Sequence, residues 1–231
     1  MKTQRLCLII LASVFISLIT IHTDSFSQNK DINYSISTSN IYYPGDEINL
    51  NLYSYNYDDK NKERKYSFEI SVLRIKDLNT FYSKYALDIL SKDSLNLLYL
   101  TEKVYSFKKT FKSKNDYGYG YLNESIPLRI DSKGAFIIKV TSSNKIAYCG
   151  FIVSDLGLIS KAGNNSLLAF VVERRTGNPV SNADLSFFMG AKQIGEGRTS
   201  DGIFYQQISE EVKAKKDDEM IPMIVGKFKE D

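Results

Sequence analysis

Histidine and cysteine, the side chains that most often act as bases, nucleophiles and metal ligands, are nearly absent from this chain. Its 231 residues include one histidine, His22, and two cysteines, Cys7 and Cys149. His22 and Cys7 lie in an N-terminal segment that has the pattern of a cleavable leader, so only Cys149 would remain after processing. A Ser-His-Asp or Cys-His nucleophile and a His-ligated zinc or iron site are therefore excluded from the mature chain.

Cys149 would have no cysteine left with which to form an intrachain disulfide. It lies in the apolar run NKIAYCGFIV, which favours a buried, unreactive thiol over a nucleophile. Carboxylates alone can hydrolyse glycosidic bonds, so a carboxylate-only hydrolase stays formally open. However, no paired-carboxylate motif, Gly-rich phosphate loop or metal cluster stands out. We expect a protein that is not an enzyme, with no catalytic, cofactor-binding or metal-binding residues and no cofactor.

Two segments carry side chains that could bind a ligand. Asp58, Asp59 and Glu63 gather carboxylates, but without the alternating oxygen spacing of a known calcium loop, so an exposed hairpin turn is favoured. The second segment, DYGYGYL at 116–122, has tyrosines at every second position that could stack on sugar rings. A loop or strand edge with tyrosines on one face explains that segment equally simply, and we favour it.

The first 27 residues predict a secretory signal peptide. Lys2 and Arg5 precede an apolar run over 6–21, and Ser25 and Ser27 follow where a signal peptidase requires small residues. The alternative is an uncleaved anchor, although the run is short for a span of about 20 residues. Cleavage would leave 204 residues with a net charge of about +2, which favours neither a nucleic-acid partner nor a strongly membrane-attracted surface. We expect export to the periplasm or cell envelope, or to the cell exterior.

Short runs of alternating side chains dominate the remaining sequence. Ile48, Leu50 and Leu52 alternate with asparagines, and Phe68, Ile70 and Val72 alternate with polar residues, which is the period of a half-buried strand. Turn-forming clusters such as YPGDE, DSKG, TGNP and TSDG separate many of these runs. The pattern predicts an all-β fold made of antiparallel sandwiches.

One segment departs from this pattern, because Leu78, Phe81, Tyr82, Tyr85 and Ile89 recur at helical spacing. We expect a short helix or two inserted between strands. We divide the mature chain into one sandwich over 28–152 and another over 153–231, joined by a short apolar segment that predicts packing of the two domains against each other.

Two turns frame the strand that begins near Ala183. Gly177 tolerates a positive φ and Pro179 fixes its own φ, so TGNP predicts a turn. Ser200-Asp201-Gly202 predicts a hairpin-type turn that joins the runs KQIGEGR and IFYQQI.

These phrases resemble macroglobulin-type domains of bacterial alpha-2-macroglobulin-like proteins. In the second region, FIVSDLGLIS, RRTGNPVSNADLSFF and GEGRTSDGIF occur in the family's order, and in the first, IYYPGDEINLNL and GAFIIKV resemble strands of the preceding domain. The resemblance covers essentially the whole mature chain. It implies two Ig-like β-sandwiches from the N-terminal part of a longer protein, or a truncated relative of one.

The resemblance also implies a function. Members of the family use many such domains as the scaffold of an endopeptidase inhibitor, in which a protease cuts a bait segment and the scaffold traps it. The family's thioester motif is Cys-Gly-Glu-Gln, whereas Cys149 is followed by Gly-Phe-Ile, and no bait-like insert is visible. We therefore expect a scaffold portion without bait or thioester, whose partners are further macroglobulin domains and, through them, proteases. The alternative is an envelope adhesion or glycan-binding module that uses Tyr119.

Overall fold

The computed structural model describes residues 32–56, 64–85, 99–116, 119–162, 166–189, 192–207 and 222–228. The signal peptide predicted at 1–27, the acidic segment at 58–63 and Tyr117 lie outside the described residues. Within the described ranges almost all regular structure is β, and the exception is one short helix, α2.

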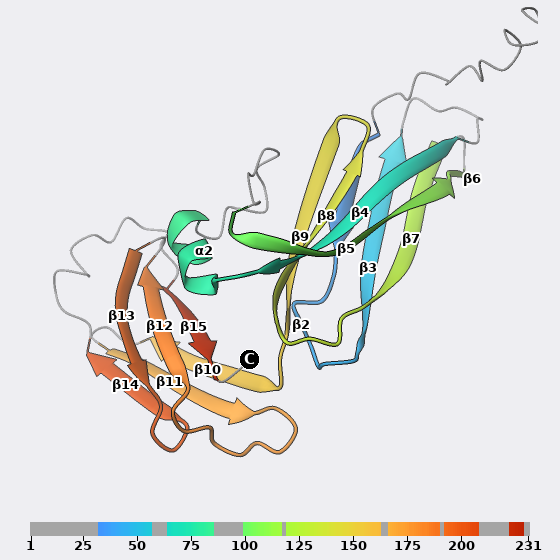
Figure 1. The fold of residues 1–231 in the computed structure, drawn as a ribbon. Coiled ribbons are helices and arrows are strands. Elements are labelled where there is room, and N and C mark those ends of the chain that lie inside the picture. The colour runs from blue at the N-terminus through green and yellow to red at the C-terminus, as the bar shows by residue number, and fades with distance from the viewer. Residues whose placement is uncertain are drawn as a thin grey trace, which may run out of the picture. The chain divides into compact units, whose positions relative to one another are not determined.

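Nine strands surround the larger hydrophobic core. They are β1 (Tyr34–Ser37), β2 (Ile41–Tyr42), β3 (Glu47–Asn56), β4 (Lys65–Ile75), β5 (Thr101–Lys112), β6 (Lys114–Asp116), β7 (Tyr119–Arg129), β8 (Gly134–Ser142) and β9 (Lys145–Val153). Sheet A has the strand order β1-β3-β7-β6, and sheet B has the order β2-β9-β8-β4-β5 (Figure 1). The chain therefore changes sheet between β1 and β2. The pairing of β2 with β9 is parallel, which departs from the expected purely antiparallel sandwich.

The core between sheets A and B contains the side chains that the alternation predicts. The core-facing side chains of β3 and β4 are fully buried: Ile48, Leu50, Leu52, Phe68, Ile70 and Val72. Aromatic rings complete the packing, since Tyr34 meets Phe68 edge-on with ring centroids 5.2 Å apart. The predicted half-buried strands are confirmed, because every second residue of these strands reaches the core.

Part of sheet B is covered on both faces. In β8, Phe136 and Ile138 belong to the main core, whereas Ile137 points the other way and packs in a smaller cluster with Phe81 of helix α2 (Leu78–Tyr85). Three consecutive apolar residues are therefore all buried, as expected where a sheet has no solvated face. The predicted helix is confirmed over 78–85, and Ile89 lies outside the described residues.

Asp77 caps the N-terminus of α2. Its Oδ1 accepts hydrogen bonds from the backbone N–H groups of Asn79 and Thr80, at 3.0 and 3.3 Å. Its Oδ2 accepts the Thr80 hydroxyl at 2.6 Å. The Thr80 hydroxyl is the largest cause of the lowered pKa of Asp77, and the two backbone N–H groups lower it further against partial desolvation. The cap satisfies donors that the first turn leaves unpaired.

The remaining strands form a second, smaller sandwich. They are β10 (Leu156–Ala162), β11 (Ser166–Glu173), β12 (Asp184–Met189), β13 (Lys192–Arg198), β14 (Ile203–Gln207) and β15 (Pro222–Lys227). Sheet C has the order β10-β11-β14 and sheet D the order β13-β12-β15 (Figure 1). Between them lie the fully buried residues Leu167, Ala169 and Val171 of sheet C and Leu185 and Phe187 of sheet D. The fold is thus all-β, with two Ig-like sandwiches in tandem and a helical insert in the first.

The predicted hairpin-type turn is confirmed: Ser200 and Ile203 form an antiparallel bridge with both backbone hydrogen bonds at 2.9 Å, and Asp201 and Gly202 have positive φ. Beyond this bridge, however, the strands on either side separate. β13 pairs with β12 in sheet D, whereas β14 pairs with β11 in sheet C, so the turn carries the chain from one sheet to the other. Two glycines in β13 allow β13 and β14 to lie close together, face to face, in the two sheets. A Cβ on Gly197 would lie 2.0 Å from the Phe204 ring, and one on Gly195 would lie 2.4 Å from the Gln206 amide. The side chains of β14 therefore pack directly on the backbone of β13.

The two turns that frame β12 contact each other. Gly202 has φ +76°, and a Cβ there would lie 2.7 Å from Cβ of Pro179 and 2.8 Å from the Val171 carbonyl oxygen. Thr199, which is buried, connects the same region: its hydroxyl donates to the Val180 carbonyl at 2.6 Å and accepts the Ala183 N–H at 3.0 Å. The TGNP and TSDG turns thus close one end of the smaller sandwich together.

Replacing Gly202 by alanine should destabilise the protein more than the same change at Gly177. Both glycines have nearly equal positive φ values, +76° and +74°, so each substitution carries a similar backbone strain of about 1 kcal/mol. A Cβ at Gly177 meets no atom within 4 Å, whereas one at Gly202 collides with Pro179 and Val171. We expect an additional loss of about 1–3 kcal/mol for Gly202→Ala, measured by urea unfolding. Equal losses would contradict this account of the contact between the turns.

Asp77→Ala should reduce the free energy of unfolding by about 1 kcal/mol at pH 7. The pKa of Asp77 is lowered in the folded state, so its stabilising effect is present above the unfolded-state pKa and is lost as the pH falls through the folded-state pKa. The difference between wild type and variant should therefore shrink below about pH 4. Asp77→Asn, which keeps an N-cap acceptor without a charge, serves as the control. A difference that is constant from pH 7 to pH 3 would contradict this reasoning.

Candidate functional site

The most elaborate polar site among the described residues surrounds the short connection between β9 and β10. This connection consists of Ser154 and Asp155. The N–H of Ser154 donates to the Tyr42 carbonyl at 3.0 Å, and its hydroxyl accepts the N–H of Leu156 at 2.9 Å. Ser154 is buried, so these bonds satisfy groups that water does not reach.

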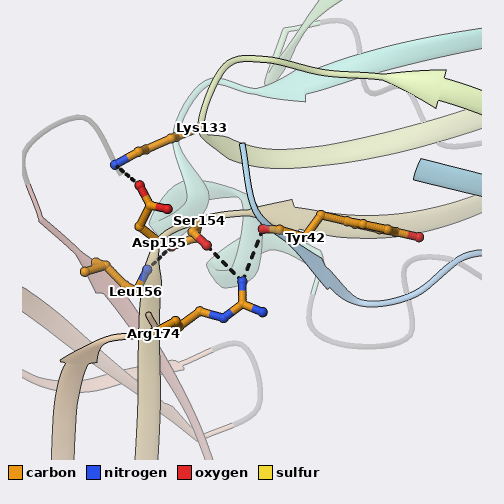
Figure 2. A network of polar contacts seen from close by, with 6 residues as sticks. All are labelled: Tyr42, Lys133, Ser154, Asp155, Leu156 and Arg174. Carbon is orange, nitrogen blue, oxygen red and sulfur yellow. Dashed lines mark hydrogen bonds and ion pairs between the residues drawn. The ribbon is translucent and has the colours of Figure 1, made fainter. Parts of the chain in front are cut away.

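Arg174, immediately after β11, binds this connection at two points and β2 at a third. Its backbone N–H donates to the Asp155 carbonyl at 2.7 Å. Its guanidinium Nη1 donates to the carbonyl oxygens of Ser154 and Tyr42, at 2.9 and 3.3 Å (Figure 2). Arginine suits this position because its guanidinium is planar, permanently charged and carries several donors in a fixed geometry. One side chain therefore joins the end of β2, the β9–β10 connection and the end of β11.

The ring of Tyr43 contacts two guanidinium groups. Cζ of Arg174 lies 4.0 Å from the ring centroid and Cζ of Arg175 lies 4.8 Å from it, which is the range of cation–π attraction. Tyr43 is held in position by the turn after it. The Asp46 carboxylate accepts a hydrogen bond from the Tyr43 N–H at 2.9 Å, and the Asp46 N–H donates to the Tyr43 carbonyl at 3.1 Å. Gly45, with φ +85°, supplies the left-handed position that this turn requires. We call Tyr42, Tyr43, Ser154, Asp155, Arg174 and Arg175 the Arg174 junction.

Two further side-chain contacts connect separate strands and loops, and one of them involves Asp155 of the Arg174 junction. Lys133 forms an ion pair with Asp155 at 3.0 Å (Figure 2). Both side chains are about one-third exposed, so the pair contributes less than about 1 kcal/mol. Asn79 of α2 donates from its amide to the Ser186 hydroxyl of β12 at 2.8 Å. These contacts join residues that are distant in sequence, and they position backbone rather than expose a reactive group.

The chemistry available here is structural. The carbonyl acceptors of the Arg174 junction are engaged by an arginine, and no group of three His, Cys, Asp or Glu residues in the described ranges could hold a metal ion. Cys149 is buried in the main core, and burial raises the pKa of its thiol to about 12. The thiol is therefore protonated at neutral pH and is a poor nucleophile, as the apolar run around it predicted.

The structure gives mixed information on the residues that the sequence singled out. The carboxylates at 58, 59 and 63 lie outside the described residues, as does Tyr117. Tyr119 lies in β7, but its side chain is not among those described, and Tyr121 is half-buried in the same strand. Sequence reasoning missed Tyr43, Arg174 and Arg175. The signal was present in the paired arginines directly before the TGNP turn and the tyrosine directly before Pro44-Gly45, but nothing in the sequence places the two together.

Arg174→Ala should be more destabilising than Arg175→Ala. The first change removes hydrogen bonds to two carbonyl groups and one cation–π contact, and we expect it to lower the free energy of unfolding by about 2 kcal/mol. Arg175 is exposed, and in the described part of the chain its side chain contacts the Tyr43 ring, so its replacement should cost less than about 1 kcal/mol. Urea unfolding of both variants measures the difference. If the two variants are equally stable, the Arg174 junction does not depend on the guanidinium–carbonyl bonds.

Within the described ranges, no helix has the length and apolar character that a membrane span requires. No protein-family model matches the chain, and no curated protein matches its sequence. The comparison of folds, however, finds solved structures that match with probability 1.00.

Two of these structures are fragments of native alpha-2-macroglobulin from Escherichia coli. The fragment that spans domains NIE-MG1 is similar with a TM-score of 0.55 and 14% sequence identity, over 80% of this chain and 90% of that fragment. The longer fragment MG0-NIE-MG1 gives a TM-score of 0.54 at 14% identity, over 78% of this chain and 59% of that fragment. The expectation of macroglobulin-like domains is thereby confirmed at the level of the fold: this chain has the macroglobulin-type arrangement of Ig-like β-sandwiches seen in the NIE-MG1 portion of a bacterial alpha-2-macroglobulin.

Proposed function

We propose that this chain is a structural, non-enzymatic scaffold portion of an alpha-2-macroglobulin-like endopeptidase inhibitor. The observation that carries the proposal is the similarity of fold to the NIE-MG1 fragment, which extends over 80% of this chain and 90% of that one. A similarity that spans two sandwiches and the connection between them favours a shared architectural role over the reuse of a single common module. The scaffold consists of one domain over 28–152 and another over 153–231, exported by the N-terminal signal.

The Arg174 junction supports a scaffold role because it uses its polar groups to hold backbone in place. Arg174 donates to the carbonyl groups of Ser154 and Tyr42, and its own N–H donates to Asp155. Such contacts limit the conformations of the two-residue connection between β9 and β10. A scaffold that holds further domains in a fixed arrangement requires such a conformationally restricted connection between its own strands.

The outer face of sheet C supports the proposal that further domains bind. On this face of the described strands, four apolar side chains are strongly exposed: Ile159 by 63%, Tyr205 by 59%, Ile203 by 50% and Leu168 by 40%. They lie on one face, because Ile159 and Ile203 are both opposite Phe170, and Tyr205 is opposite Leu168. An apolar cluster of this kind marks a protein-binding surface rather than a solvated one. We propose that a further macroglobulin domain of a longer chain covers this face.

The scaffold does not trap a protease by itself. Trapping in this family depends on a bait segment and, in many members, on a thioester formed by Cys-Gly-Glu-Gln. The mature cysteine here is Cys149, which is followed by Gly150 and Phe151 and is buried in the core with a raised pKa. We propose that the natural product includes further domains that supply the inhibitory segment, and that proteases are partners only through those domains.

The test uses the natural gene product beside the isolated chain. An antibody against the described strands is used to purify the product from the envelope fraction of the source organism, and trypsin or subtilisin is added. We expect the natural product to be larger than 26.3 kDa and to retain the protease during gel filtration. The isolated chain, as the matched control, should retain none, because neither bait nor thioester is present. A natural product of this chain's own mass that retains no protease would overturn the inhibitor role. Retention of the protease by the isolated chain would overturn the proposal that further domains supply the inhibitory segment.

A further inference from the structure

The solvent-facing side of sheet A has an unusual chemistry for this chain. Six exposed residues form two rows across β1, β3 and β7: Ser37, Asn51 and Ser125 in one row, and Ser35, Tyr53 and Asn123 in the next. We call these six residues the sheet A strip. Their alternate neighbours along β3 and β7, such as Leu50, Leu52 and Ile126, are buried in the core, so the strip points away from it.

The sheet A strip is uncharged, although a quarter of all residues in this chain are charged. Along this face of β3 and β7, the next charged residues are Glu47 and Arg129, which are opposite each other four residues beyond Asn51 and Ser125. At the rise of a β-strand this is about 14 Å away. At the other end, Lys114 of β6 is opposite Tyr121 and forms an ion pair with Glu124 at 3.6 Å. The six residues of the strip are therefore neutral, and the lysines that border it are each engaged: Lys114 is paired with Glu124, and Lys145 donates to Asn33, two residues before Ser35.

The strip combines an aromatic ring with amides and hydroxyls. The Tyr53 side chain is half-exposed, at 50%, and Asn51 and Asn123 lie beside it, one along the same strand and one directly across the sheet. Neither amide forms a hydrogen bond with another side chain in the described part of the structure, so donors and acceptors remain for a ligand. Ser125 donates to Asn49 at 3.2 Å, which orders the edge of the strip.

We propose that the sheet A strip binds a neutral glycan chain. A sugar ring has a face of C–H groups that can lie on the Tyr53 ring, and hydroxyls around its rim that both donate to and accept from Asn51 and Asn123. The other ligand classes fit poorly. Nucleic acids and acidic polymers require lysine or arginine, and an apolar protein surface requires aliphatic side chains, which are found on the outer face of sheet C instead.

This inference goes beyond the proposed scaffold role and does not depend on it, since the strip and the outer face of sheet C lie in different sheets. The strip differs from the tyrosine segment at 116–122, because its aromatic residue is Tyr53 of β3. A flat site with one aromatic ring predicts weak binding that becomes useful when a polymer offers many repeats.

The test is native affinity electrophoresis of the chain in gels that contain a dissolved polysaccharide. Neutral polymers (mannan, dextran and xyloglucan) are compared with acidic ones (alginate and polygalacturonate) and with a gel without polymer. We expect at least one neutral polymer to slow the chain and the acidic polymers to have no effect. Tyr53→Ala and Asn123→Ala should each weaken the retardation at least tenfold, whereas Tyr53→Phe should retain it because the ring remains.

Tyr99→Ala is the matched control, since it removes a tyrosine of similar exposure, 52%, from the turn before β5. It should migrate as wild type does in every gel. Thermal unfolding followed by circular dichroism verifies that the Tyr53 variants are folded, as expected for outward-facing positions. The proposal is overturned if no neutral polymer slows the chain, if the acidic polymers slow it equally, or if Tyr53→Ala is slowed as much as wild type. Failure of this test leaves the protease-retention test of the scaffold role unaffected.

Discussion

Each sheet of this protein must bury one face against a second sheet, and the rest of the structure depends on that constraint. Successive side chains of a strand point to opposite faces, so a strand with one apolar side has only one way to lie on a core. Ile48, Leu50 and Leu52 bring β3 onto the larger core in this way, and Leu167, Ala169 and Val171 do the same for β11 in the smaller one. Once the inner faces are assigned, the outer faces are free to differ in chemistry.

The outer faces of three sheets differ markedly. Sheet A presents serine, asparagine and tyrosine, sheet B is partly covered by α2 through Phe81 and Ile137, and sheet C presents Ile159 and Ile203. Core packing alone does not require an uncharged polar outer face or an apolar exposed one, because both are solvent-facing in the described structure. These two faces are therefore the ones to which we assign a ligand and a further domain, while the helix on sheet B extends a core.

Turns are the positions that constrain this backbone most tightly. Several of the phrases that carry the family resemblance contain turns, and some of these turns meet in space. Tyr43 before the Pro44-Gly45 turn contacts Arg174 and Arg175 before the TGNP turn, and Pro179 of that turn contacts Gly202 of the TSDG turn. Positive φ at Gly45, Gly177 and Gly202 fixes the direction in which the chain leaves each turn. Core positions tolerate many apolar side chains, whereas these backbone positions tolerate few.

The sequence by itself determined the local structure. Alternation identified the buried sides of β3 and β4, helical spacing identified α2, and glycine, proline and aspartate identified the turns at 43–46, 176–179 and 200–202. Composition narrowed the candidate chemistry, since the one histidine, His22, lies in the predicted signal peptide. The apolar run around Cys149 correctly predicted that this side chain is buried. All of these depend on neighbours within a few residues, which a sequence displays directly.

The tertiary structure decided which strands pair and which distant residues meet. A hairpin-type turn such as that at 200–202 can continue into a two-stranded ladder, but beyond the Ser200–Ile203 bridge β13 pairs with β12, β14 pairs with β11, and Phe204 packs on Gly197. The contact of Arg174 with Tyr42 joins residues 132 positions apart, and the rows of the sheet A strip depend on the register of β1, β3 and β7. Periodicity tells which side of a strand is buried, but pairing and register follow from the packing of the whole chain.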